Sequence, residues 1–143
     1  MGNAILMGGG YNLLRKSGKC AYGYIAGQNN ATLTQAFPGI GFQPTAWAIW
    51  NDATSFSSMG SGPKLYIMAY IHDADIGYYY KASSSGIQSG ITTKLSTCSY
   101  DIATGAVTVT VNTDAPNGAM WNVHSGYKVY FLFLRDRPQT IAA

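Results

Sequence analysis

His72-Asp73-Ala74-Asp75 is the closest grouping in this chain of residue types that bind metals. Imidazole and carboxylate groups hold cations such as zinc or calcium, and His72 and Asp75 could share one ion with His124 supplied from elsewhere. The simpler interpretation is a turn, because aspartate side chains readily hydrogen-bond to nearby backbone groups. The sequence therefore predicts no metal site, with His72 and Asp75 as the candidate ligands if one exists.

Residue types and spacing also give no sign of a catalytic site. Hydrolysis of a glycosidic bond needs two carboxyl groups at a set separation, and every acidic residue here is an aspartate in an expected turn or loop. A cysteine nucleophile needs a histidine base and an orienting acid. Cys20 or Cys98 could pair with His72 or His124, but no motif brings them together. We expect a protein that is not an enzyme, with no catalytic residues and no cofactor.

The two cysteines, Cys20 and Cys98, both fall in strand-like alternations. Such residues behave as small buried hydrophobic side chains, which we favour over a disulfide, although the sequence leaves their pairing open.

Aromatic residues in or beside expected loops are better candidates for contact. An aromatic ring offers a sugar a flat apolar face, and a phenol adds a hydrogen bond. Aromatic residues are also enriched at protein interfaces. Consecutive Tyr78, Tyr79 and Tyr80 must place at least one ring on each face of a strand. The alternative role for any single ring is core or sheet cover. The candidate ligand-binding residues are Trp50, Phe56, Tyr78, Tyr79, Tyr80 and Trp121.

The chain is poor in charge. Charged residues make up 10% of the sequence and glutamate is absent, whereas an ordinary soluble domain has about 25% charged residues. Repulsion between such molecules is weak, which favours assembly. The net charge of +3 comes from scattered lysine and arginine residues, without the dense basic stripe of a nucleic-acid surface.

Alternation with a period of two predicts strands along most of the chain. The clearest example is Lys64 to His72, where aliphatic side chains occupy one face and Tyr66, Met68 and Tyr70 occupy the other. Residues 91 to 100 are expected to form one strand. In residues 127 to 134 both faces are largely apolar, which predicts a central strand or one between subunits.

These elements predict an all-β fold, an antiparallel β-sandwich of jelly-roll-like type with about eight or nine strands. We expect residues 1–18 to form a flexible lead-in or assembly arm, which either packs on the domain edge or holds a neighbouring subunit. Residues 19–135 form the sandwich and residues 136–143 a C-terminal tail. The start lacks the features of a signal peptide, and no apolar run is long enough for a transmembrane segment.

Three segments resemble the small β-sandwich domains of tailed-bacteriophage tail fibres, baseplate appendages and related virion proteins. They are the glycine–aromatic–proline corner and strand at 41–50, the valine–threonine strand at 107–111 and the closing aromatic strand at 126–134. The likeness covers roughly residues 19 to 134. It implies a homotrimer in the virion, other virion proteins as partners, and a host-surface ligand such as a bacterial glycan.

The expected function is therefore a non-enzymatic virion appendage domain, serving as a receptor-binding or structural knob that contacts glycan through loop aromatics. Two alternatives remain open: a free-standing carbohydrate-binding lectin, and a capsid-decorating structural protein with no ligand.

Overall fold

The computed structural model describes residues 5–7, 11–27, 34–52, 65–83, 86–111 and 127–136, and no helix occurs among them. The expected loop at 51–63 and the expected short strand at 119–123 lie almost wholly outside these ranges. The strands in chain order are β1 (Ile5–Met7), β2 (Tyr11–Lys16), β3 (Cys20–Ala26), β4 (Thr34–Phe37), β5 (Ala46–Asn51), β6 (Leu65–Ile71), β7 (Ile76–Ser83), β8 (Gly86–Thr92), β9 (Ser96–Tyr100), β10 (Val107–Val111) and β11 (Lys128–Leu134).

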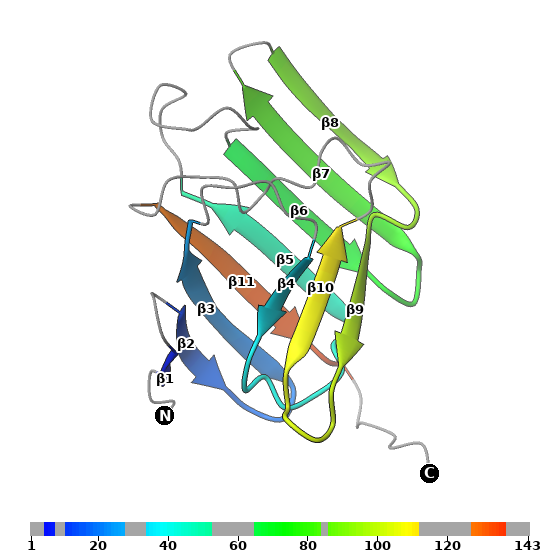
Figure 1. The fold of residues 1–143 in the computed structure, drawn as a ribbon. Coiled ribbons are helices and arrows are strands. Elements are labelled where there is room, and N and C mark those ends of the chain that lie inside the picture. Colours follow the sequence, from blue (N-terminus) through cyan, green and yellow to red (C-terminus); the bar gives the residue numbers. More distant parts are fainter. Residues whose placement is uncertain are drawn as a thin grey trace.

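The strands form two antiparallel sheets. The large sheet has the order β1-β2-β3-β11-β5-β6-β7-β8, and the small sheet has the order β4-β10-β9. The small sheet lies across one face of the large one (Figure 1). The predicted all-β antiparallel sandwich is confirmed. The described strands outnumber the eight or nine expected, because two come from the N-terminal segment and one expected strand is divided in two.

The N-terminal segment is part of the large sheet. Strand β2 pairs with β3, and β1 pairs with β2. The Leu13 side chain is buried, and the Tyr11 hydroxyl donates a hydrogen bond to the Pro38 carbonyl oxygen at 2.7 Å. Residues 5–7 and 11–16 of the expected lead-in therefore lie at one edge of the large sheet. The three glycines at 8–10 suggested flexibility, and the register shift between Leu13 and Arg15 interrupts the alternation that would mark β2 as a strand.

Residues 91–100 do not form one strand. They supply the end of β8 and all of β9, which belong to different sheets. Lys94 between them has a φ of 53°, and its backbone N–H donates to Asp75 Oδ1 at 2.8 Å. This left-handed residue ends the alternation and turns the chain from the large sheet to the small one.

Aromatic side chains join the two sheets. The ring of Phe37 on β4 lies 4.8 Å from that of Phe131 and 5.1 Å from that of Phe133, both on β11. The indole Nε1 of Trp47 on β5 donates to Ser96 Oγ on β9 at 3.1 Å. Because these side chains occupy one face of β5 and β11, the intervening residues of both strands project from the opposite face of the large sheet.

Strand β6 turns its aliphatic face away from the core. Met68 and Tyr70 are buried against the small sheet, whereas Ile67 and Ile71 are exposed. The sequence separates these two faces correctly, but both are apolar, so the pattern does not say which one is inside. Because Met68 and Tyr70 face inward, the aliphatic face of β6 lies on the outside of the molecule.

Candidate functional site

The face of the large sheet that points away from the small sheet is the candidate site, and we call it the outer face. Cross-strand pairing aligns its side chains in rows. Leu134, Ala46, Ile71 and Ile76 form one row across β11, β5, β6 and β7. The next row comprises Tyr22, Leu132, Ala48, Ala69, Tyr78 and Ile91, from β3 to β8.

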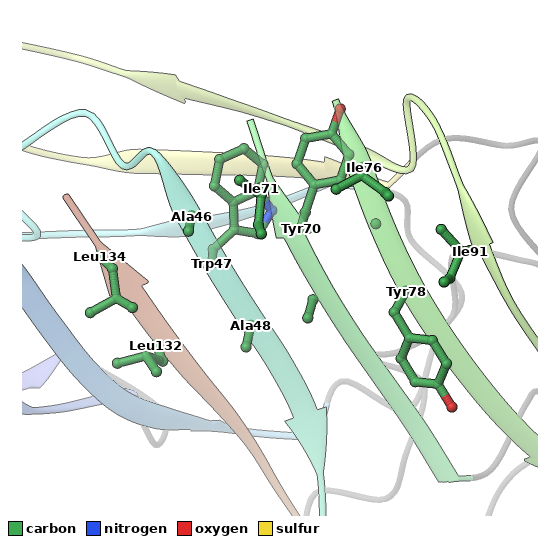
Figure 2. A pocket seen from close by; sticks show the side chains of 12 residues that line it. Ala46, Trp47, Ala48, Tyr70, Ile71, Ile76, Tyr78, Ile91, Leu132 and Leu134 are labelled. Carbon is green, nitrogen blue, oxygen red and sulfur yellow. The ribbon is translucent and has the colours of Figure 1, made fainter. Parts of the chain in front are cut away.

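A hollow of about 370 Å³ lies in the middle of these two rows. Its floor is made by Ala46 and Ala48 on β5 and Ala69 on β6. Figure 2 shows Leu132 and Leu134 on one side of Ala46 and Ala48, and Tyr78 and Ile91 on the other. The hollow exists because methyl groups stand between strands that carry longer side chains.

Many of the side chains around the hollow are open to solvent. Ile71 is 51% exposed and Ile91 is 71% exposed, and Ile76, Tyr78 and Leu134 are also exposed. Soluble monomers rarely leave large contiguous apolar patches uncovered, and such patches commonly mark interaction sites.

Charge is confined to the margins of the outer face in the part of the chain that the structure describes. Arg15 lies opposite Tyr22 at the β2 side, and Lys128 is at the start of β11. The lining of the hollow contains alanine, glycine, aliphatic and aromatic residues, and no acid, base or amide. Such a lining can bind an apolar surface, but it offers no group that could act as a general acid or base other than a tyrosine phenol.

A third row on the outer face is aromatic. Tyr24, Tyr130 and Trp50 lie on adjacent strands β3, β11 and β5. The Trp50 and Tyr130 rings stack with centroids 5.8 Å apart, and Tyr24 meets Tyr130 edge to face at 5.9 Å. The Lys128 ammonium lies 5.2 Å from the Tyr24 ring centroid. The predicted contact residue Trp50 is therefore half-buried in a row of rings at the side of the hollow.

The three consecutive tyrosines divide between the faces. Tyr78 lies on the outer face opposite Ala69, and Tyr80 lies opposite Ile67 on the same face. Tyr79 packs against the hydrophobic core instead. The structure thus brings Trp50, Tyr78 and Tyr80 onto one face and separates Tyr79 from them. Phe56 and Trp121 lie outside the described residues.

Asp75 has a structural role at the β6–β7 turn. Its Oδ1 accepts hydrogen bonds from the Tyr70 hydroxyl and from the Lys94 backbone N–H. These two bonds lower the pKa of the Asp75 carboxyl. The candidate ligand His72 is exposed, and its ring stacks 6.4 Å from that of Trp47. Within the described ranges no three histidine, cysteine or acidic residues gather as a metal site would need, and His124 lies outside them.

The cysteines are both free, Cys20 on β3 and Cys98 on β9. Burial raises the pKa of the Cys98 thiol to about 12. A thiol with that pKa stays protonated near neutral pH and is a poor nucleophile, so Cys98 has the character of the small buried hydrophobe that its alternation predicts.

The alanines and leucines of the hollow were missing from the sequence-based candidates. A signal for them was present, because residues 127–134 are apolar on both faces and predict a central or intersubunit strand. Three small residues spread over the consecutive strands β5 and β6 carry no motif, so the hollow emerges only from the pairing of β5 with β6 and β11.

Comparison with models of protein families, with curated protein sequences and with solved structures gives no match for this chain. Among the residues described, none forms a helix with the length and apolar character that crossing a membrane requires.

Proposed function

We propose that this chain is a non-enzymatic structural domain of a virion appendage, and that it assembles with further copies of itself through the outer face. The observation that carries the proposal is the exposed, uncharged hollow over Ala46, Ala48 and Ala69. The virion setting rests on the resemblance of the corner and closing strand to phage appendage domains, which also implies a trimer.

The size of the outer face suits contact between copies. Six adjacent strands, from β3 to β8 in sheet order, span about 29 Å at a spacing of about 4.8 Å. Three outward side chains on each strand span about 20 Å. The face then offers about 600 Å² per copy, or about 1,200 Å² for a pair, which is the lower limit for a stable protein interface.

Shape and charge also favour a second copy as the occupant. The leucines of β11 and the isoleucines of β6 to β8 stand above an alanine floor, so a ridge on one copy can fill the hollow of another. The margins carry positive charge at Arg15 and Lys128, while the centre has none to repel an identical surface. Contact between copies would therefore remove apolar area from water with little electrostatic cost.

The direct test is a charge placed on the floor of the hollow. Ala69→Glu changes an exposed position on β6, so we expect the fold to survive, which circular dichroism would check. The buried carboxylate would be unpaired in the interface, and light scattering should show the assembly dissociating to single chains. The matched control is Ile102→Glu, at a residue 60% exposed in the β9–β10 turn, which should keep the native mass. An unchanged mass for Ala69→Glu would contradict the proposal.

Glycan contact is a second candidate, supported by the aromatic row of Tyr24, Tyr130 and Trp50 beside Lys128. Because these rings stack on one another, they present edges and phenol tips more than open faces to a sugar. A glycan array followed by titration tests this candidate: Trp50→Ala should abolish binding, whereas Ile102→Ala should leave it intact. A ligand that binds both variants equally would exclude the aromatic row as its site.

A further inference from the structure

Strand β8 is the last strand of the large sheet. It pairs with β7 along Gly86–Thr92 and has no second neighbour among the described strands. Figure 1 shows it at one border of the sheet, at the opposite end from β1 and β2. An edge strand of this kind presents backbone hydrogen-bonding groups to whatever approaches it.

The sequence of β8 lacks the features that usually block an edge. Natural edge strands carry charges, prolines or bulges that prevent pairing with other chains. Residues 86–92 read Gly-Ile-Gln-Ser-Gly-Ile-Thr, without a charge or a proline. Their pairing with β7 runs without a register shift, so no bulge twists the edge away. Within the described strands, β8 therefore carries no feature that blocks pairing with another chain.

The two isoleucines of β8 are placed symmetrically about Ser89. Ile87 is 66% exposed and Ile91 is 71% exposed, the two highest values among the exposed large hydrophobic side chains of the described residues. Both lie on the outer face, because Ile91 is opposite Tyr78 and Ile87 is two positions away from Ser89 on the same side. Ile87 and Ile91 each lie two residues from Ser89. Two copies of β8 that run antiparallel with Ser89 opposite Ser89 therefore place each isoleucine opposite an isoleucine.

We propose that β8 pairs antiparallel with β8 of a second copy, about a two-fold axis at Ser89. Ser89 then lies opposite Ser89 of the other copy, and Ile87 of each lies opposite Ile91 of the other. Cross-strand pairs of β-branched side chains stabilise antiparallel strands, and such a two-fold contact is self-complementary. The pairing extends the proposed self-assembly by a second contact, and it does not require that the hollow be occupied by another copy.

The small area of the β8–β8 contact predicts that it is weak. Seven paired residues extend about 24 Å, and with a sheet thickness of about 10 Å the contact measures about 240 Å² per copy. A stable interface uses about 800 Å² per partner. We therefore expect β8 pairing to depend on protein concentration when it acts alone, and to strengthen where the outer-face contact already holds copies together.

Cysteine cross-linking tests the register directly. In Ser89→Cys the two new thiols face each other at a Cα separation of about 4.5–5.5 Å, within the range that a disulfide spans. In Gln88→Cys, the matched control, each cysteine lies opposite Gly90 of the other copy and points to the other face of the sheet. Under mild oxidation we expect Ser89→Cys to form a covalent dimer and Gln88→Cys to stay single. Equal yields from both variants, or no dimer from Ser89→Cys, would overturn the proposed pairing.

The same cross-link in the Ala69→Glu background separates this inference from the proposed function. If Ala69→Glu dissociates the main assembly and Ser89→Cys still cross-links at high concentration, both contacts are supported. If Ala69→Glu has no effect on mass while Ser89→Cys cross-links, the hollow contact fails and the β8 pairing stands. If Ala69→Glu dissociates the assembly and Ser89→Cys never cross-links, the β8 pairing fails and the hollow contact stands.

Discussion

At the scale of single residues, Tyr70 and Asp75 connect two turns of the sandwich. The Tyr70 hydroxyl donates to Asp75 Oδ1, which also accepts the N–H of Lys94 at the turn between β8 and β9. Asp75 and Lys94 both have positive φ, at 47° and 53°. A hydrogen bond between a nearly buried phenol and a carboxylate thus holds two turns in conformations that are unfavourable for residues with side chains.

Tyr70→Phe removes that bond and should lower the free energy of unfolding by about 1–2 kcal/mol. Burial and the hydrogen bond to Asp75 raise the pKa of Tyr70 from 10.0 to about 12. Because the folded chain keeps this proton where the unfolded chain has lost it, the stability due to Tyr70 is fully present below about pH 10 and is lost toward about pH 12. Urea unfolding at a series of alkaline pH values checks this. The decline should be steeper in the native chain than in Tyr70→Phe, and identical slopes would contradict it.

At the scale of elements, Gly77 allows β7 to pack against the chain that leads into β9. A Cβ at this position would lie 2.6 Å from Leu95 Cδ2 and 2.8 Å from Tyr70 Cδ2. We expect Gly77→Ala to cost about 1–3 kcal/mol by overpacking, measured by chemical unfolding. Gly18→Ala is the control, since nothing lies within 4 Å of its added Cβ, and its effect should be within about 0.5 kcal/mol. Equal effects of the two substitutions would show that Gly77 has no packing role.

Local alternation predicted most elements, and its failures have physical causes. The strands around Trp47, Val109 and Phe131 follow a period of two because one face meets the core. Strand β6 is apolar on both faces, so its pattern gives the strand and not its orientation. The split at Lys94 depends on a hydrogen bond to a turn 19 residues away, which a local window of sequence does not show. In β2 the register shift between Leu13 and Arg15 breaks the alternation that would mark a strand.

The candidate site was predictable to a smaller extent. Trp50, Tyr78 and Tyr80 were predicted as contact residues from their type, and the structure places them on one face. Tyr79 has the same type, but strand alternation sends it to the core side. The residue type of the alanines does not predict a binding role, because they form the hollow only by being shorter than their neighbours.

At the scale of the whole molecule, the described strands cover one face of the large sheet and leave the other without a second sheet. The small sheet covers the inner face of the large sheet, and the outer face keeps a hollow lined by apolar residues. An apolar sheet face and an edge strand without a charge, proline or bulge are both liabilities for a protein that functions alone. Both become useful in an assembly, where the same surfaces are buried between copies.

The most direct test of self-assembly is the solution mass of the unaltered chain, measured by light scattering over a range of concentrations. Contact between two identical outer faces predicts a mass of two chains, whereas the trimer that the resemblance implies would give three chains through contacts between different parts of the face. Further growth at high concentration is expected from β8 pairing. A mass of one chain at every concentration would show that the outer face does not join copies of this protein.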